Sequence, residues 1–543
     1  MGHPIPRHAD RSRLATSQSA ASTVLRKPIP SSYFPFGHSP ITQGLADHLR
    51  QAVRLAPSPT NPIHEFGFKN GTVMTINELP SRHINLWRKV KGPVGPRIYD
   101  RLDEIQEEVE AGEGRTRTRP ASVSDDFVKC IRAICLDLFH ANKVDPVMVT
   151  GVHRNHNQLT KNASYPTFVT ARTFGAALDG LHATGYVEEV SKGTEGSGKT
   201  TRVRATPQLI QKMSVIGFSK PDISDNAEGI RLALTNGKSK SKVRTAYSDN
   251  AETARWRANL DVINREIGRH VIGLNRTRTE LDDLEVQRRM SASLAAAKEK
   301  KPYDYQRLDM DAVRLHRVFN SADWCDGGRY YGGWWQNVPK EYRRFITIDG
   351  KDTCEYDYSS IHPRLLYAQS GHRWPLNQDP YEAPHGPELR DAVKSAFLIM
   401  LNMQGTIQKR QVPGFDSATA DMTWDHFVKG IVETHAPISK FLGTGTGVKL
   451  QRIDADIAEA VMLKFTKMHY ACLPVHDSFI TLASLGDELI DYMKQVVRET
   501  QGIEIEVTPK PTHTYSGPAG RIDTDISELL APTDAIEKSL LLR

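Results

Sequence analysis

Cysteine is scarce in this chain: among 543 residues there are only five, Cys130, Cys135, Cys325, Cys354 and Cys472. No two of them form a Cys-x-x-Cys pair, which argues against a disulfide framework and a cysteine-based zinc site and is typical of a reducing compartment. The chain also lacks any run of about 18 apolar residues, so we expect no membrane span. Its N-terminal residues lack the apolar core of a secretory signal. We therefore expect a cytoplasmic protein with no membrane partner.

A large excess of charge of one sign is missing as well. The 71 basic and 64 acidic residues leave a net charge of +7. That balance permits a nucleic-acid partner without establishing one. The length suits two or three domains. We expect a mostly disordered arm over residues 1–69, a helical linker region over 70–121, a winged-helix-like domain over 122–213, a linker over 214–250 and a larger domain over 251–543.

The pattern of the region 122–213 is typical of a winged helix. Apolar periodicity predicts helices over Asp125–Asn142 and Thr170–Thr184. A hairpin follows, with strands over Tyr186–Ser191 and Thr200–Ala205 and a basic tip between them. Such a domain places a helix in the major groove of DNA and its hairpin on phosphates. The expected phosphate contacts are Arg172, Lys192, Lys199, Arg202 and Arg204; the alternative is a small helical domain that binds protein.

The hairpin tip also matches a nucleotide-binding pattern. Residues 193–200, GTEGSGKT, satisfy G-x-x-x-x-G-K-[ST]. That mechanism needs a helix directly after the lysine, because the helix N-terminus holds the phosphates. Here the following residues, Thr201–Ala205, are strand-like and are soon followed by Pro207. We therefore interpret the glycines as turn residues and expect no nucleotide there.

Two long, mostly exposed helices are predicted over Thr253–Lys300. The apolar side chains that define the first helix are Leu260, Ile263, Ile267, Val271 and Leu274, and Leu281 and Leu284 define the second. Without further context, a coiled interaction arm would explain both.

Two aspartates far apart in the sequence point to chemistry. Asp357 ends a strand-like segment directly before a helix, and Asp477 lies on a tight turn between two short apolar strands. Two carboxylates on neighbouring strand ends suit a pair of Mg²⁺ ions, for which Mn²⁺ can substitute. A helix between them carries Arg390, Lys394, Leu398 and Asn402 at spacings of four, hence on one face. Two cations on one face suit a triphosphate, although a solvated helix face is the plainer explanation.

In this order, the segments resemble the superfamily of family A DNA polymerases and single-subunit, phage-type RNA polymerases. DYSSIHPR (357–364) resembles motif A, D-Y-S-Q-I-E-L-R; RDAVK (390–394) resembles motif B, R-x-x-x-K; and VHDSF (475–479) resembles motif C. Gly328-Arg329 and QNVP (336–339) resemble the segment before motif A. QRIDADI (451–457) resembles the Q-x-x-A-A-D-I helix before motif C. The resemblance covers residues 253–543 at most.

The resemblance implies an α+β right-hand polymerase fold, with a helical thumb over 251–300 and a palm with reduced fingers over 303–543. It implies that Asp357 and Asp477 hold both metal ions, with the Tyr358 carbonyl as an additional ligand. Arg390 and Lys394 would bind the incoming triphosphate, and His476 would contact the primer end. Leu398, Asn402 and His362 would line the nucleotide site, and the residues expected to contact nucleic acid are Arg329, Gln336, Gln451 and Arg364.

Three positions depart from the DNA polymerase pattern. His362 replaces the glutamate that excludes a ribose 2′-hydroxyl, Asn402 replaces an aromatic residue that helps to select the sugar, and Ser478 is the RNA polymerase form. The choice between dNTPs and NTPs is therefore left open. We find no set of exonuclease carboxylates and expect no proofreading.

The first interpretation is thus a template-directed DNA polymerase of a mobile element or phage, with DNA template and primer, nucleoside triphosphates and other replication proteins as partners. We expect a monomer. One alternative is an RNA polymerase or primase with the same site. Another is a catalytically inactive, DNA-binding replication initiator or regulator.

Overall fold

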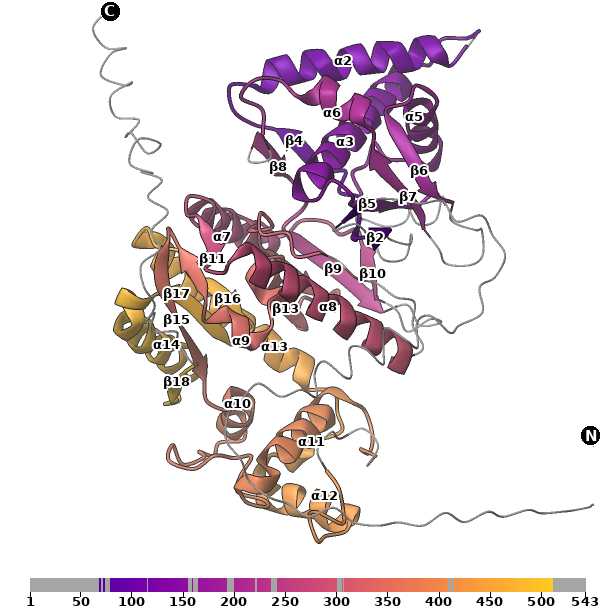
Figure 1. Cartoon of the computed structure of the whole chain (residues 1–543). Coiled ribbons are helices and arrows are strands. Elements are labelled where there is room, and N and C mark those ends of the chain that lie inside the picture. The colour runs from indigo at the N-terminus through magenta and orange to yellow at the C-terminus, as the bar shows by residue number, and fades with distance from the viewer. Residues whose placement is uncertain are drawn as a thin grey trace, which may run out of the picture. The chain divides into compact units, whose positions relative to one another are not determined.

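The computed structural model has a mixed α+β fold (Figure 1). It describes residues 68–69, 72–73 and 79–510, apart from 115, 155–158, 160–164, 193–199, 220–221, 236–241, 300–304, 306, 409–411 and 413–414. Most of the expected N-terminal arm lies outside these residues, and so does Lys199. The first described elements, β1 (Phe68–Lys69) and β2 (Thr72–Val73), form a short antiparallel pair. Among the described residues, no helix is both long enough and apolar enough to cross a membrane.

One hydrophobic core belongs to residues 79–225. Its helices are α2 (Gly95–Gly112), α3 (Ala121–Val144), α5 (Ala171–Ala183) and α6 (Pro207–Met213). They pack with a four-stranded sheet in the order β3 (Ser81–His83), β5 (Val149–Val152), β7 (Thr201–Ala205), β6 (Val187–Ser191). A second, two-stranded sheet pairs β4 (Arg88–Val90) with β8 (Ile223–Asp225).

The local sequence explains the two long helices and the hairpin here. The predicted apolar face of α3 is buried, including Phe127, Ile131 and Ile134. Helix α5 begins at Thr170, whose hydroxyl accepts a hydrogen bond from the Thr173 amide, and it ends before Gly185 at φ +80°. Strand β7 begins two residues after Lys199, so the helix required by a phosphate loop is not present at 201–205, as expected. The prediction of a helical region over 70–121 is wrong in part, because β3 and β4 precede α2.

A second, larger core contains two sheets (Figure 1). The first runs β10 (Lys242–Thr245), β9 (Ile230–Thr235), β12 (His316–Phe319), β13 (Gly327–Tyr331), with β9 and β12 parallel. The second runs β11 (Ile272–Leu274), β14 (Ile346–Ile348), β15 (Lys351–Tyr358), β17 (Ser478–Leu482), β16 (Leu473–Val475), and β18 (Val507–Pro509) also pairs with β15.

Helices surround these two sheets. Helix α13 (Gly447–Lys467) packs against β13, against α7 (Ala251–Ile267) and against α14 (Gly486–Gln501). Helix α11 (Arg390–Asn402) packs against α12 (Trp424–Thr434) in the orange part of Figure 1. The remaining α-helices are α8 (Arg278–Glu299), α9 (Lys340–Arg343) and α10 (Ile361–Gln369), and the short 3₁₀ helices are η2 (Trp334–Asn337), η3 (Pro387–Leu389), η5 (Ala436–Phe441) and η6 (Ala483–Leu485).

Two expectations about residues 214–300 are corrected. Part of the expected linker over 214–250 forms β8, β9 and β10, and the last two belong to a sheet of the larger core. Leu274 lies in β11 rather than on the first predicted helix, which ends at Ile267. That helix is also less exposed than predicted, because Trp256, Leu260 and Ile263 are fully buried against the sheet and α13.

Candidate active site

Strand pairing brings Asp357, on β15, next to the turn that carries Asp477, directly before β17. Asp357 is near the end of β15, and its register partner on β17 is Ser478, the residue after Asp477. The Tyr358 amide donates to the Asp477 carbonyl at 3.5 Å. Antiparallel pairing thus brings together two carboxylates that are 120 residues apart in the sequence.

The turn that carries Asp477 is short and strained. His476 and Asp477 connect β16 to β17, whose ends pair through Val475 and Ser478. His476 has φ +60°, a conformation that two-residue hairpins require and that costs a residue other than glycine about 1 kcal/mol or more. The Ser478 hydroxyl donates to Glu355 at 2.8 Å, and Arg343 donates to the same carboxylate at 3.0 Å. These bonds fix the base of the turn.

The charge state of Asp357 reflects this placement. Burial, and then the negative charge of Asp477, raise the pKa of Asp357 to about 6, although the ammonium groups of Lys510 and Lys394 oppose the rise. The Lys510 ammonium lies 2.5 Å from one carboxylate oxygen of Asp357. The other oxygen, Oδ1, is buried and has no hydrogen-bond partner among the described residues. The site therefore has negative charge and a donor oxygen available for an added cation.

These residues fit the predicted metal ions in kind. Carboxylate and carbonyl oxygens are the ligands that Mg²⁺ prefers. The Tyr358 side chain is buried and its hydroxyl donates to the Met493 carbonyl at 2.9 Å, so only its backbone carbonyl is left as a ligand. A different group, His140, Asp309 and Asp311, also brings its ligand atoms within 4.8 Å of one another. It belongs to α3 and to the segment before β12, and it shares no residue with this site.

Helix α11 presents the predicted face. Arg390, Lys394, Leu398 and Asn402 are exposed or half-buried, whereas the opposite side of the helix is buried. Lys394 is exposed, and its positive charge acts on Asp357. Arg390 is bound to Asp379, with its Nε donating at 2.8 Å. Among the described residues, no carboxylate pairs with Lys394, so Lys394 is available to a triphosphate. Arg390 is already paired, so a triphosphate would compete with Asp379 for it.

A buried cluster that the sequence did not predict joins two of the expected residues. Asp454 of α13 accepts hydrogen bonds from Arg329 at 2.5 Å and pairs with the His362 Nε2 at 2.7 Å. These two partners lower the pKa of Asp454 against the effect of burial. Asp454 in turn raises the pKa of His362. Arg329 and His362 are therefore held by Asp454.

Two residues expected to contact nucleic acid have structural partners instead. Arg364 is buried, and its five N–H groups donate to the carbonyls of Ser359, Trp374, Pro375, Leu376 and Gln378. The prediction for Arg364 is therefore wrong, because no donor is left for a ligand. Gln336 donates to the carbonyls of Tyr330 and Pro474, both at 3.0 Å, and so links η2 to β13 and β16. Gln451 is half-buried on α13, one turn before Asp454.

The winged-helix candidates do not form one free basic surface. Arg172 is exposed in the first turn of α5, and Lys192 is exposed 3.8 Å from Glu189. Arg204 pairs with Glu188 at 2.7 Å. Arg202 is half-buried on β7, in register with Ser191.

Three further residues belong to this site and were missed. Asp454 stands where the resembled helix pattern has alanine. A carboxylate in place of a small apolar residue was the sequence signal that could have identified it. Tyr381 is fully buried, with the Lys394 ammonium 5.9 Å from its ring centre. Burial and the charge of Asp477 raise its pKa. Tyr381 and Lys510 lie in segments with no motif, so the sequence offered no signal for either.

Comparison with known proteins adds no family to this geometry. No family model matches the chain, and no curated protein matches it. The polymerase interpretation therefore depends on the motifs and on the arrangement of Asp357, Asp477 and Lys394 described above.

Proposed function

We propose that the chain is a template-directed nucleotidyltransferase: a DNA-dependent DNA polymerase of a mobile element or phage, without proofreading. In this proposal residues 251–543 form a compact right-hand polymerase. The domain over 122–213 binds DNA as a winged helix, and Arg172 and Lys192 are its most exposed candidate contacts. A cytoplasmic, monomeric protein is part of the same proposal.

The reaction is an in-line phosphoryl transfer. The 3′ oxygen of the primer attacks the α-phosphorus of the nucleotide, its proton is lost, and pyrophosphate leaves. Two Mg²⁺ ions, when bound, lower the pKa of the attacking hydroxyl and neutralise charge on the leaving group. Asp357 and Asp477 would hold them. Lys394 would bind the triphosphate and donate a proton to the leaving pyrophosphate, and positioning and charge neutralisation supply most of the rate.

The observation that carries this proposal is the pairing of Asp357 with the turn of Asp477. Asp357 lies beside the turn of Asp477, burial and then the charge of Asp477 raise the pKa of Asp357, and one buried oxygen of Asp357 lacks a donor in the described structure. The cationic face of α11 lies within electrostatic reach of the same pair.

The test is primer extension on a defined DNA template with Mg²⁺ or Mn²⁺, with dNTPs and NTPs in separate reactions. Asp477→Asn should abolish incorporation. Asp352→Asn is the matched control, because Asp352 is exposed at the start of β15, the strand that carries Asp357. Extension with dNTPs alone supports a DNA polymerase. Full activity of Asp477→Asn would refute the metal assignment.

An RNA polymerase or primase is the second candidate, and one observation favours it. The resembled RNA polymerases have serine after the catalytic aspartate of motif C, and Ser478 occupies that position here. Its hydroxyl donates to the buried Glu355, so this serine is part of the structure of the turn. Extension with NTPs, or synthesis without a primer, would support this candidate. Absence of any product would favour the inactive initiator, for which the occupied Arg390 is the supporting observation.

A further inference from the structure

One face of the β10–β9–β12–β13 sheet carries a row of basic residues outside the candidate active site. Arg231 on β9 is in register with Val318 on β12, and Arg244 on β10 is in register with Ala233 on β9. Because residues two apart in a strand share a face, Arg244, Arg231 and His316 point to the same side of the sheet. On the other side Ile230, Leu232 and Phe319 are buried, together with Arg317, which pairs with Glu459.

The arginines on this face repel one another. Burial, and then the neighbouring Arg244 and Arg314, lower the pKa of Arg231 to about 10, despite the nearby acidic residues. Burial also lowers the pKa of Arg244. His316 has its pKa lowered strongly by burial and by the same three arginines, so it is neutral and able to donate one hydrogen bond. A row of this kind is stabilised by an added anion.

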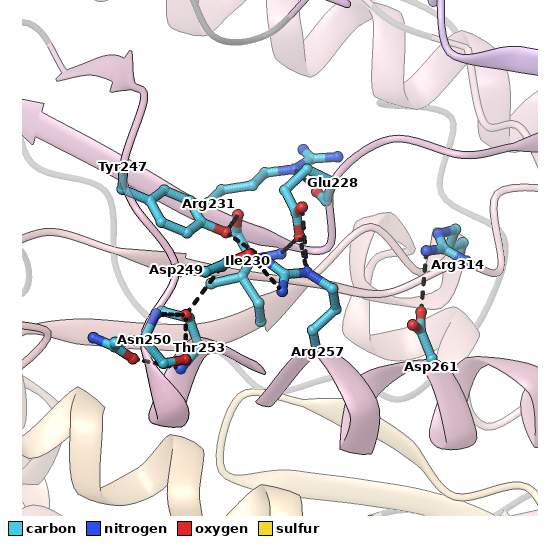
Figure 2. Close-up of polar contacts among 10 residues, drawn as sticks. All are labelled: Glu228, Ile230, Arg231, Tyr247, Asp249, Asn250, Thr253, Arg257, Asp261 and Arg314. Carbon is cyan, nitrogen blue, oxygen red and sulfur yellow. Dashed lines mark hydrogen bonds and ion pairs between the residues drawn. The ribbon is translucent and has the colours of Figure 1, made fainter. Parts of the chain in front are cut away.

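Two of the carboxylates close to this row are paired with arginines, and Asp225 accepts hydrogen bonds from the Asn85 side chain and the Ala227 amide. Figure 2 shows Glu228 bonded to Arg257, at 3.1 Å from its Nε, whereas Arg231 donates to the backbone carbonyl of Glu228 and to no carboxylate of the described residues. Arg314 faces Asp261 at 3.4 Å in the same view. Arg244 has no ion pair or hydrogen bond from its side chain to any described residue.

The row borders a large cavity whose wall also carries the carboxylates of Asp225, Asp261, Asp309 and Asp311. The cavity has a volume of about 1040 Å³, and Arg231, Arg244, Arg314 and His316 line it. Its wall reaches Gly332, the residue after Tyr331. Tyr331 is 37% exposed, its ring centre is 6.2 Å from that of His316, and it is also 6.2 Å from that of His476. An exposed aromatic ring thus lies between the basic row and the turn of Asp477.

We infer that this face binds the phosphate backbone of a single nucleic-acid strand that runs to or from the candidate active site, with Tyr331 as a stacking surface for a base. A basic groove followed by an exposed aromatic side chain is the combination by which proteins hold single strands without sequence preference. A free nucleotide would need only one end of the row, whereas the row together with Tyr331 covers four adjacent strands, which span roughly 14 Å at about 4.8 Å each. The inference rests on the proposed function, because it assigns the substrate's path to the same domain.

The test compares DNA binding by the full-length protein and its variants at several salt concentrations. The probe is a fluorescent primer–template with a single-stranded overhang, and affinity is read by anisotropy without nucleotide. Arg244→Ala removes a side chain without a described partner, so it should leave folding intact. Arg231→Ala/Arg244→Ala removes two contacts. Arg498→Ala is the matched control, because Arg498 is exposed on α14 and pairs with Glu504.

For a single strand, each lost phosphate contact reduces the slope of log affinity against log salt by about 0.7. In the double variant the slope should therefore be smaller by about 1.4. Between 50 and 200 mM salt, the loss of affinity of the double variant should then be roughly 7-fold smaller than that of the unmodified protein. Arg244→Ala should reduce the slope by about 0.7, half of the decrease in the double variant, and Arg498→Ala should not change the slope. An unchanged slope in both Arg244 variants would overturn the inference, and so would a rise in the KM for nucleotide with unchanged DNA binding.

Asp477→Asn separates this inference from the proposed function. It should bind the probe as the unmodified protein does and fail in extension. If Asp477→Asn extends primers while the double variant still binds with a reduced slope, the metal assignment fails and the strand site stands.

Discussion

Replacing Asp357 by asparagine should make the protein more stable while abolishing catalysis. The folded protein raises the pKa of this carboxyl from its ordinary 3.8 to about 6, so ionisation at neutral pH opposes folding. At 1.36 kcal/mol for each pH unit between the two pKa values, the opposition is about 3 kcal/mol above pH 7. The side chain is only 19% exposed, which leaves little solvent to screen the effect. Asparagine has the same shape and carries no charge.

The sign of the pH dependence follows from proton binding. Between about pH 4 and 6 the folded state holds the Asp357 proton that the unfolded state has released, so the stability of the unmodified protein falls as the pH rises through this window. The advantage of Asp357→Asn should be about 3 kcal/mol at pH 8, about 1.5 kcal/mol at pH 5, and absent well below pH 4.

Urea denaturation in the presence of EDTA measures this difference. Tryptophan fluorescence is a suitable signal, because the Trp335 indole donates to the Pro474 carbonyl in β16, next to the turn of Asp477. Added Mg²⁺ should stabilise the unmodified protein and have little effect on the variant, since a ligand stabilises only the state that binds it. The exposed Asp352→Asn, on the same strand, is the control and should change nothing. Equal stability of Asp357→Asn and the unmodified protein at pH 8 would refute the electrostatic reasoning.

Three further substitutions test other parts of the site. Lys394→Ala should raise the KM for nucleotide and lower kcat, together by about 10²-fold or more, because it removes a charge from the triphosphate and the leaving group, while the exposed Lys429→Ala should have no effect in the same extension assay. Arg364→Ala should lower the free energy of unfolding by about 3 kcal/mol or more in urea titrations, because five carbonyls lose their donors. Arg373→Ala, at an exposed position nearby, is the control, and a loss below about 1 kcal/mol for Arg364→Ala would contradict the assigned role. His362→Glu should destabilise the protein by about 2–4 kcal/mol in the same titrations, since it places a second buried carboxylate beside Asp454, and adding Asp454→Ala should restore most of the loss; no rescue would refute the coupling.

The helices and the strands of the motifs could be predicted from local sequence patterns. The wrong secondary-structure predictions have a common cause. The apolar period of Asp125–Asn142 and the capping hydroxyl of Thr170 are local signals, and both helices formed where they were predicted. The strand of Asp357 and the turn of Asp477 were also predicted, because short apolar strands and turn residues are local signals too. Leu274 was assigned to a helix because its spacing fits one, but pairing with Ile346 in β14 places it in a strand. Pairing between distant strands overrides local periodicity, and a single sequence does not show it.

The sequence also could not show which groups the basic side chains bind. A basic residue in a motif looks the same in sequence whether it faces a ligand or a carbonyl. Arg364 and Arg390 both lie in motif segments, yet the first donates to five backbone carbonyls and the second to Asp379. Conversely, Arg231 and Arg244 lie in a segment expected to be a linker, and only the strand register brings them to one face. Backbone geometry alone brings Asp357 and Asp477 together, so their proximity followed from the strand and turn patterns, and their role stays a prediction.

The cluster of His362, Asp454 and Arg329 changes how two departures from the resembled pattern are interpreted. Taken singly, histidine in place of a glutamate and aspartate in place of an alanine each look like a lost feature. In the structure the two side chains meet at 2.7 Å, so the carboxylate missing from α10 is supplied by α13, and Asp454 fixes the imidazole in place. In the proposed function, a fixed ring beside the bound nucleotide would exclude a 2′-hydroxyl by bulk, as a fixed glutamate would. Relaxed sugar selection therefore does not follow from His362 alone, and the paired substitution of His362 and Asp454 is the change that tests it.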